Sequence, residues 1–91
     1  MNTLFLLMAR YNAAPTIPVE TVCADFFSHL APDKFVRKVE AGEIKLPVIR
    51  METSQKAAKH VALVDLARYL DERHAAAARE LEQLSRARAG A

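Results

Sequence analysis

The chain has 91 residues, of which 52% are hydrophobic and 26% are charged. These values are typical of one small globular domain and exclude a disordered or fibrous chain. The net charge is only +2, but residues 31–60 hold seven lysines and arginines against four acidic residues, a local excess of +3 that is typical of a unit contacting nucleic acid.

The first predicted element is a helix over roughly residues 2–12, because Leu4, Leu7, Met8 and Tyr11 follow the i, i+3, i+4, i+7 spacing of one helix face. No basic residue precedes this apolar run and Arg10 ends it, too soon for an export signal or a membrane span. We therefore expect a cytoplasmic, nucleoid-associated protein with no membrane partner.

A second helix is predicted to begin at Pro18 or its neighbour and to run through Phe27, after a segment, residues 12–18, that two prolines break. Cys23 shares the apolar face of this helix, which indicates a core residue. As the single cysteine of the chain, it excludes an intramolecular disulfide and a zinc site made of cysteines. Residues 28–31 then form a tight turn, so the spacing is that of a helix-turn-helix.

A short basic helix is predicted over about residues 32–41, since Pro32 suits the first helical position and Gly42 the residue just past the end. Its apolar residues, among them Phe35, lie on one side and the two acids on the flank. Its three cations, Lys34, Arg37 and Lys38, form a separate stripe. Such a stripe suits the phosphates or guanine edges that a recognition helix contacts, and the alternative is an ordinary solvated face.

A β-hairpin, or wing, is predicted over about residues 45–64. Its first strand holds Ile44, Leu46, Val48 and Ile49, with an early Pro47 that indicates a sheet edge. The loop is polar over residues 53–59, with a short helical turn over 54–59 as the alternative, and residues 60–64 return as the second strand. A polar, basic tip can follow phosphates or enter a minor groove, although such loops are often merely solvated.

The predicted DNA-binding residues come from this helix and this hairpin. They share a positive charge or a hydrogen-bonding side chain, and they are Lys34, Arg37, Lys38, Lys45, Arg50, Ser54, Gln55, Lys56, Lys59 and His60.

From Asp65 onward a long helix is predicted, since neither proline nor glycine intervenes before Gly90. A narrow seam with the spacing of a coiled coil runs along it through Leu70, His74, Ala77, Leu81 and Leu84. A helix of about 24 residues is about 36 Å long, more than so small a domain can cover. We expect the distal half to meet another chain, most simply in a homodimer, and the alternative is that the seam packs on its own domain.

No catalytic site is expected. His29, His60 and His74 lack metal-ligand spacing, and the chain has no glycine-rich phosphate loop. The sequence therefore predicts a protein that is not an enzyme and holds no metal or cofactor.

Five stretches together resemble the pyocin activator (PrtN-type) family of small transcriptional activators encoded near phage-derived bacteriocin and prophage genes. They are TLFLLMARY, IPVETVCADFF, KFVRKVEAGEIKLPVIR, SQKAAK and VALVDLARYLDER, and they cover most of the chain. The resemblance implies binding to a promoter-proximal DNA element and activation of pyocin genes, with no catalytic residues.

The expected fold is thus mainly α with a small β-hairpin. It is similar to the winged helix-turn-helix of MerR-like and excisionase proteins, with residues 1–64 as the DNA-binding part and 65–91 as an oligomerisation helix of the same domain. We expect a sequence-specific transcriptional activator that binds duplex DNA and has RNA polymerase as a further partner. The alternatives are an excisionase-like DNA-bending protein and a protein-binding antirepressor or adaptor.

Overall fold

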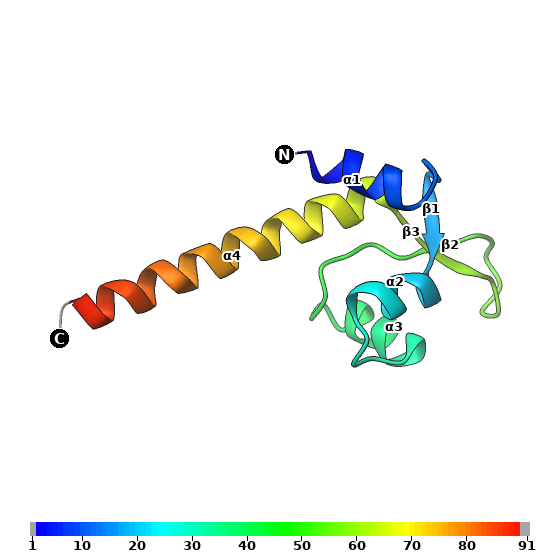
Figure 1. Cartoon of the computed structure of the whole chain (residues 1–91). Helices are drawn as coiled ribbons and strands as arrows, with labels where there is room; N and C mark the ends of the chain where they lie inside the picture. Colours follow the sequence, from blue (N-terminus) through cyan, green and yellow to red (C-terminus); the bar gives the residue numbers. More distant parts are fainter. Residues whose placement is uncertain (1, 90–91) are drawn as a thin grey trace.

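The computed structural model describes residues 2–89 and has a small body from which one long helix protrudes (Figure 1). Over these residues the elements are helix α1 (Thr3–Arg10), strand β1 (Thr16–Pro18), helices α2 (Val19–Phe26) and α3 (Pro32–Glu40), strands β2 (Ile49–Arg50) and β3 (Lys59–Ala62), and helix α4 (Leu63–Ala89). The expectation of a mainly helical chain with a small β-sheet and a long C-terminal helix is confirmed.

The sheet has three antiparallel strands in the order β1-β3-β2. Ile17 of β1 lies opposite Val61 of β3, and both are buried. The sequence did not indicate β1, because three residues that follow Pro15 and include Pro18 resemble a plain break. The strand exists because β3 supplies partners for Thr16, Ile17 and Pro18, and a partner of that kind is not visible in local sequence.

The hairpin is shorter than predicted. The strand expected from Ile44 onward is only the two residues of β2, because Pro47 has no N–H to donate and no strand runs beside residues 44–48. Ile44 and Leu46 are nevertheless buried in the core. The returning strand was also misplaced by a residue or two, since β3 ends at Ala62 and α4 begins at Leu63.

Local capping sets the helix ends. The Asn2 side chain accepts a hydrogen bond from the Phe5 N–H at the start of α1. At the end of α3, Gly42 takes a positive φ of 77° while its N–H donates to the Val39 carbonyl and the Glu43 N–H donates to the Lys38 carbonyl. These paired bonds are a Schellman motif, in which the helix stops at a residue that tolerates left-handed backbone.

The core joins all the helices to one face of the sheet. Phe27, just after α2, stacks at a tilt on Phe35 of α3, with ring centroids 5.0 Å apart, and on Tyr69 of α4 at 5.8 Å. Cys23 is buried as predicted, and burial raises the pKa of its thiol. The first half of α4 contributes Leu66, which is fully buried, so the helix is anchored in the body.

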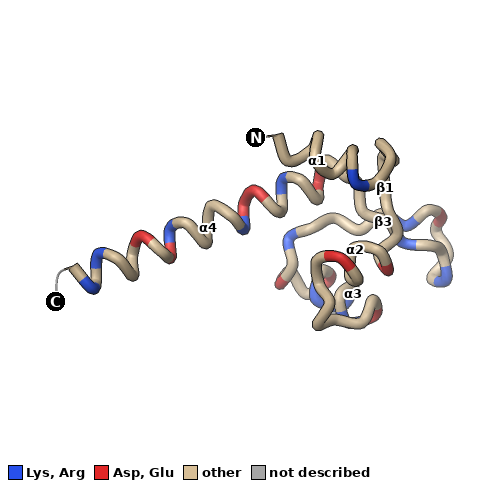
Figure 2. The backbone as a smooth tube through the Cα atoms, in the orientation of Figure 1, with Lys and Arg blue, Asp and Glu red and all other residues tan. Residues whose placement is uncertain are grey.

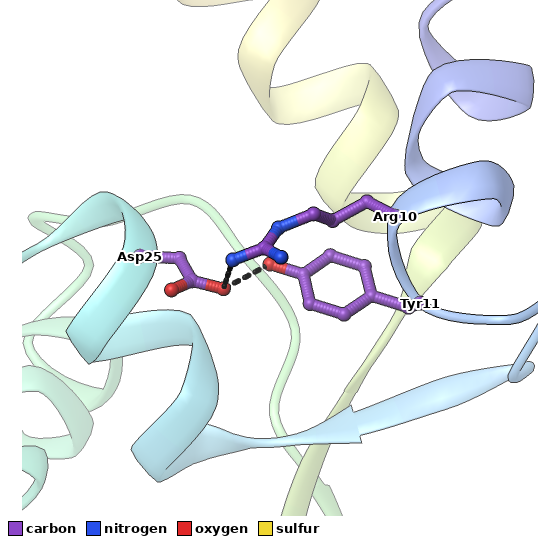
Figure 3. Close-up of polar contacts among 3 residues, drawn as sticks. All are labelled: Arg10, Tyr11 and Asp25. Atoms are coloured by element: carbon purple, nitrogen blue, oxygen red, sulfur yellow. Dashed lines mark hydrogen bonds and ion pairs between the residues drawn. The ribbon is translucent and has the colours of Figure 1, made fainter.

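A polar cluster ties α1 to α2 (Figure 3). The Tyr11 hydroxyl donates a 2.5 Å hydrogen bond to the Asp25 carboxylate. The Arg10 guanidinium lies 3.6 Å from the same oxygen and 5.6 Å from the centre of the Tyr11 ring. A second link joins α1 to α4, where the Thr3 hydroxyl donates to Asp71 at 2.5 Å.

The second half of α4 extends away from the body with no other element beside it (Figure 1). This extension accounts for the elongated molecule, whose extents are 56 × 29 × 18 Å. Among the described residues, no helix combines the length and apolar character that crossing a membrane requires.

Candidate nucleic-acid interface

Helix α3 presents a basic outer stripe, as its periodicity predicts. Phe35 is fully buried, whereas Lys34 and Arg37 are exposed on the opposite side. Within residues 2–89 neither cation forms an ion pair, so both are available to an anionic partner. Lys38 differs, because it is half-buried and its ammonium group lies 3.5 Å from Glu43.

The tip loop, residues 51–58 between β2 and β3, has internal order. The Met51 N–H donates to the Ala58 carbonyl and closes the hairpin, while the Ala57 N–H donates to the Ser54 carbonyl in a single turn. The Ser54 hydroxyl also accepts from the Lys56 N–H. Ala57 is buried, which anchors the loop to the body. The loop thus contains one hydrogen-bonded turn, but the alternative of a helical turn over residues 54–59 is wrong, since no helix forms there and Lys59 belongs to β3.

A groove of about 570 Å³ separates α3 from the tip loop. One wall is formed mainly by α3, and the other by β2, the tip loop and β3. Its lining residues are Val19, Glu20, Pro32, Asp33, Val36, Glu40, Arg50, Gln55, Lys56, Ala57, Ala58 and Lys59. The structure therefore brings four predicted residues together, Arg50, Gln55, Lys56 and Lys59, opposite one side of the basic helix.

Strand register explains why two of these cations turn toward α3. Lys59 stands two residues before Val61 along β3, so the two side chains lie on the same sheet face. Arg50 is the partner of Lys59 across β2 and β3 and therefore shares that face. That face is the one the helices cover. The Arg50 guanidinium accordingly reaches Glu40 of α3 at 3.9 Å.

The groove is electrostatically mixed, which sequence reasoning missed. Asp33 and Glu40 were placed on the flank of α3, but that flank is the one facing the hairpin. In Figure 2 basic positions lie on α3 and on the segments around the tip loop, with acidic positions among them. Within residues 2–89 the cations without an ion-pair partner thus include Lys34 and Arg37 on the outer stripe of α3 and Lys56 and Lys59 on the hairpin, whereas Arg50 is engaged by Glu40.

Besides Lys34, Arg37 and Lys38 of α3, three predicted residues do not line this groove. Lys45 lines a separate groove of about 530 Å³ between residues 42–47 and α4. The His60 ring lies 3.0 Å from the Thr16 hydroxyl, on the sheet face opposite Val61. Ser54 uses its hydroxyl within the tip turn.

The predicted seam of α4 divides into two parts. Leu70 packs against the core, while His74 and Ala77 are exposed and Leu81 and Leu84 remain 66% and 63% exposed. The alternative that the whole seam packs on its own domain is therefore wrong for its distal residues. A further apolar surface that the sequence reasoning did not single out lies on α1, where Phe5 is 68% and Leu6 is 53% exposed.

Taken together, these features define a small, mainly helical protein that presents a short helix with exposed cations beside a polar loop. The comparisons with known proteins assign it more closely. The family model for "Pyocin activator protein PrtN" matches residues 3–77, so the chain belongs to the pyocin activator family. No curated protein and no solved structure matches it.

Proposed function

We propose that this protein is a transcriptional activator of pyocin or prophage genes that binds promoter-proximal duplex DNA as a winged helix-turn-helix. Membership of the pyocin activator family suggests the activation of such genes. The observation that carries the DNA-binding part is the unpaired, exposed cation stripe of Lys34 and Arg37 on α3. A helix inserted in a major groove needs such a surface.

The topology supports the same proposal. Helices α2 and α3 are joined by a short connection, residues 27–31, and pack against each other as a helix-turn-helix does. The tip loop lies across a groove from α3, and this arrangement supports the assignment of the hairpin as a wing. In this arrangement α3 reads base edges while Lys56 and Lys59 contact phosphates of the adjacent backbone.

The experiment first selects the DNA sites that the protein binds from a library of random duplexes. Fluorescence anisotropy then measures binding to the selected site and to a scrambled duplex over a range of salt concentrations. We expect a clear preference for the selected site and an affinity that falls as salt rises. Failure to enrich any duplex above background would contradict the proposal.

Lys34→Ala with Arg37→Ala should weaken binding to the selected site, since removing a bidentate hydrogen-bonded pair with a base costs about 1–3 kcal/mol. Lys38→Ala should have a smaller effect, because Glu43 already engages its ammonium group. The matched control is Arg73→Ala with Arg79→Ala, which removes two positive charges from exposed positions of α4. Equal losses in both double variants would mean that only net charge matters.

Lys56→Ala with Lys59→Ala should behave differently, with weaker binding to all duplexes and a salt slope lower by roughly one for each phosphate that the protein no longer neutralises. A changed sequence preference with an unchanged slope would assign base reading to the tip instead.

One observation favours the second candidate, a protein-binding adaptor or antirepressor. Phe5 and Leu6 form an exposed apolar surface on α1, and such surfaces commonly mark contacts with proteins. An activator also needs a protein partner, for which RNA polymerase is the natural expectation. The two functions separate in the selection experiment, because an adaptor enriches no duplex.

A further inference from the structure

The distal half of α4, defined as residues 74–89, carries an apolar stripe that nothing in the body covers. Leu81 and Leu84 are 66% and 63% exposed, and Ala77 lies on the same side one turn earlier. Two large leucines at this exposure, on an isolated helix, are costly to leave in water. The family match ends at residue 77, so both leucines lie beyond it.

This stripe continues the face by which α4 packs on its own body. Leu63, Leu66 and Leu70 follow the same helical spacing toward Ala77 and Leu81, and the first two are buried while Leu70 packs against the core. The body therefore covers the first half of one continuous face. The second half of α4 extends beyond the body (Figure 1), so the body leaves that part of the face open.

We propose that the distal half of α4 pairs with the distal half of α4 from a second copy of this chain, and that the two helices run antiparallel. The pairing rests on the packing of α4 alone and does not depend on DNA binding. Leucines and alanine from the two copies then cover one another, with the polar His74 and Arg88 at the ends of the overlap.

Sterics select the antiparallel direction. In a parallel pair the same faces would meet along the whole of both helices, and each body would occupy the space needed by the other, because each covers that face at Leu63 and Leu66. In an antiparallel pair each helix ends near the partner's body, and the two bodies lie at opposite ends.

Charge supports the same direction. Residues 63–75 hold Asp65, Asp71 and Glu72 against two arginines, and residues 76–89 hold three arginines against two glutamates. Antiparallel pairing brings the basic end, with Arg86 and Arg88, toward the more acidic first half of the partner. Parallel pairing would bring like ends together.

The available area is sufficient for a self-associating interface and small enough to make it reversible. Sixteen residues of helix span about 24 Å, and two helices packed over that length bury on the order of 1,000 Å². This lies at the lower limit of specific interfaces, so we expect a dimer that dissociates as the protein is diluted.

Sedimentation of the full chain over a range of concentrations tests the pairing. We expect wild type to reach the dimer mass by about 100 µM, and Leu81→Glu with Leu84→Glu to weaken association at least about tenfold, because the charges would enter the interface. The control, Arg79→Gln with Gln83→Glu, makes the same net charge change on the opposite helix face and should leave the dimer intact. A monomeric wild type, a dimeric leucine double variant, or a control that also dissociates would overturn the proposal.

Cysteine cross-linking tests the direction. In the antiparallel pair His74 and Arg88 of different copies are neighbours, whereas each position lies roughly 20 Å from its own copy. Under mild oxidation, a mixture of His74→Cys and Arg88→Cys should therefore form the mixed disulfide dimer, and neither variant alone should cross-link. Wild type, whose Cys23 is buried, serves as the unlinked control. Self-linking of each variant without the mixed product would establish the parallel pair and refute the antiparallel one.

Discussion

Tyr11 shows how a single hydroxyl can secure one helix to another. Its hydrogen bond to Asp25 links the end of α1 to α2, and the ring lies beside Arg10 (Figure 3). Burial, the hydrogen bond to Asp25 and the negative charge of Asp25 raise the pKa of Tyr11 to about 12, while Arg10 acts in the opposite direction. The folded state therefore favours the protonated form of the Tyr11 phenol more than the unfolded state does.

The raised pKa of Tyr11 predicts a pH dependence of stability. The unfolded phenol titrates near its ordinary pKa of 10.0 and the folded one near 12, so this contribution is complete below pH 10 and is lost as pH rises toward 12. Tyr11→Phe removes the hydrogen bond and should lower the free energy of unfolding by about 1 kcal/mol at pH 8.

Urea unfolding of wild type and Tyr11→Phe at pH 8 and pH 11 measures this effect. Because the two proteins differ only at this side chain, the difference between their free energies of unfolding isolates the contribution of Tyr11. We expect that difference to shrink at pH 11. A difference that stays constant, or grows, would show that the phenol is not stabilised in its protonated form.

The individual site residues differ in how far sequence could place them. Lys34 and Arg37 were assigned to the outer side of α3 correctly, because a helix wheel needs only local spacing. The ion pair between Arg50 and Glu40 could not be anticipated, since it depends on the register between β2 and β3 and on the packing of α3 against the sheet.

At the scale of elements, the helices were predictable because their ends are set by local chemistry. The hairpin of β2 and β3 was predicted with longer strands, and β1 was not predicted. Pro32 and Gly42 bound α3 within one residue of the predicted range. Strands β1 and β2 exist because β3 lies between them and pairs with both. With only three and two residues, neither strand is long enough to show a recognisable alternation in its own sequence.

The end of α3 gives a prediction at this scale. Gly42 has φ of 77°, and a Cβ added there would meet no atom within 4 Å, so Gly42→Ala costs only backbone strain. We expect a loss of about 1 kcal/mol in the free energy of unfolding. Gly42→Asn should cost less, because asparagine tolerates the left-handed region better.

Urea denaturation of the two Gly42 variants checks that order. Since the Schellman motif positions the last turn of α3, which carries Arg37 and Lys38, any loss of DNA affinity should follow the same order. Equal stability of wild type and Gly42→Ala would show that the left-handed cap is not required.

At the scale of the whole molecule, the paired α4 helices would fix where the two bodies stand. With the overlap centred near Leu81, Leu66 in the body lies about 15 residues, or roughly 22 Å, from the centre. The two bodies are then about 45 Å apart along α4, at a rise of about 1.5 Å per residue. This distance exceeds the roughly 34–36 Å of one DNA turn. We therefore do not expect the dimer to bind two half-sites that are only one turn apart.

We therefore expect the selected DNA to contain an inverted repeat whose half-site centres lie more than one helical turn apart, because a two-fold dimer presents its two α3 helices with two-fold symmetry. Footprinting should show wild type protecting both half-sites. Leu81→Glu with Leu84→Glu should protect a single half-site and bind the full operator at least about tenfold more weakly, since the two bodies are no longer linked. A direct repeat in the selected DNA would contradict the two-fold pairing but would still establish DNA binding. If wild type bound no duplex at all, the proposed function itself would be contradicted. In such a dimer the spacing of the half-sites would be set by the apolar stripe of α4, and the affinity for each half-site would be set by α3.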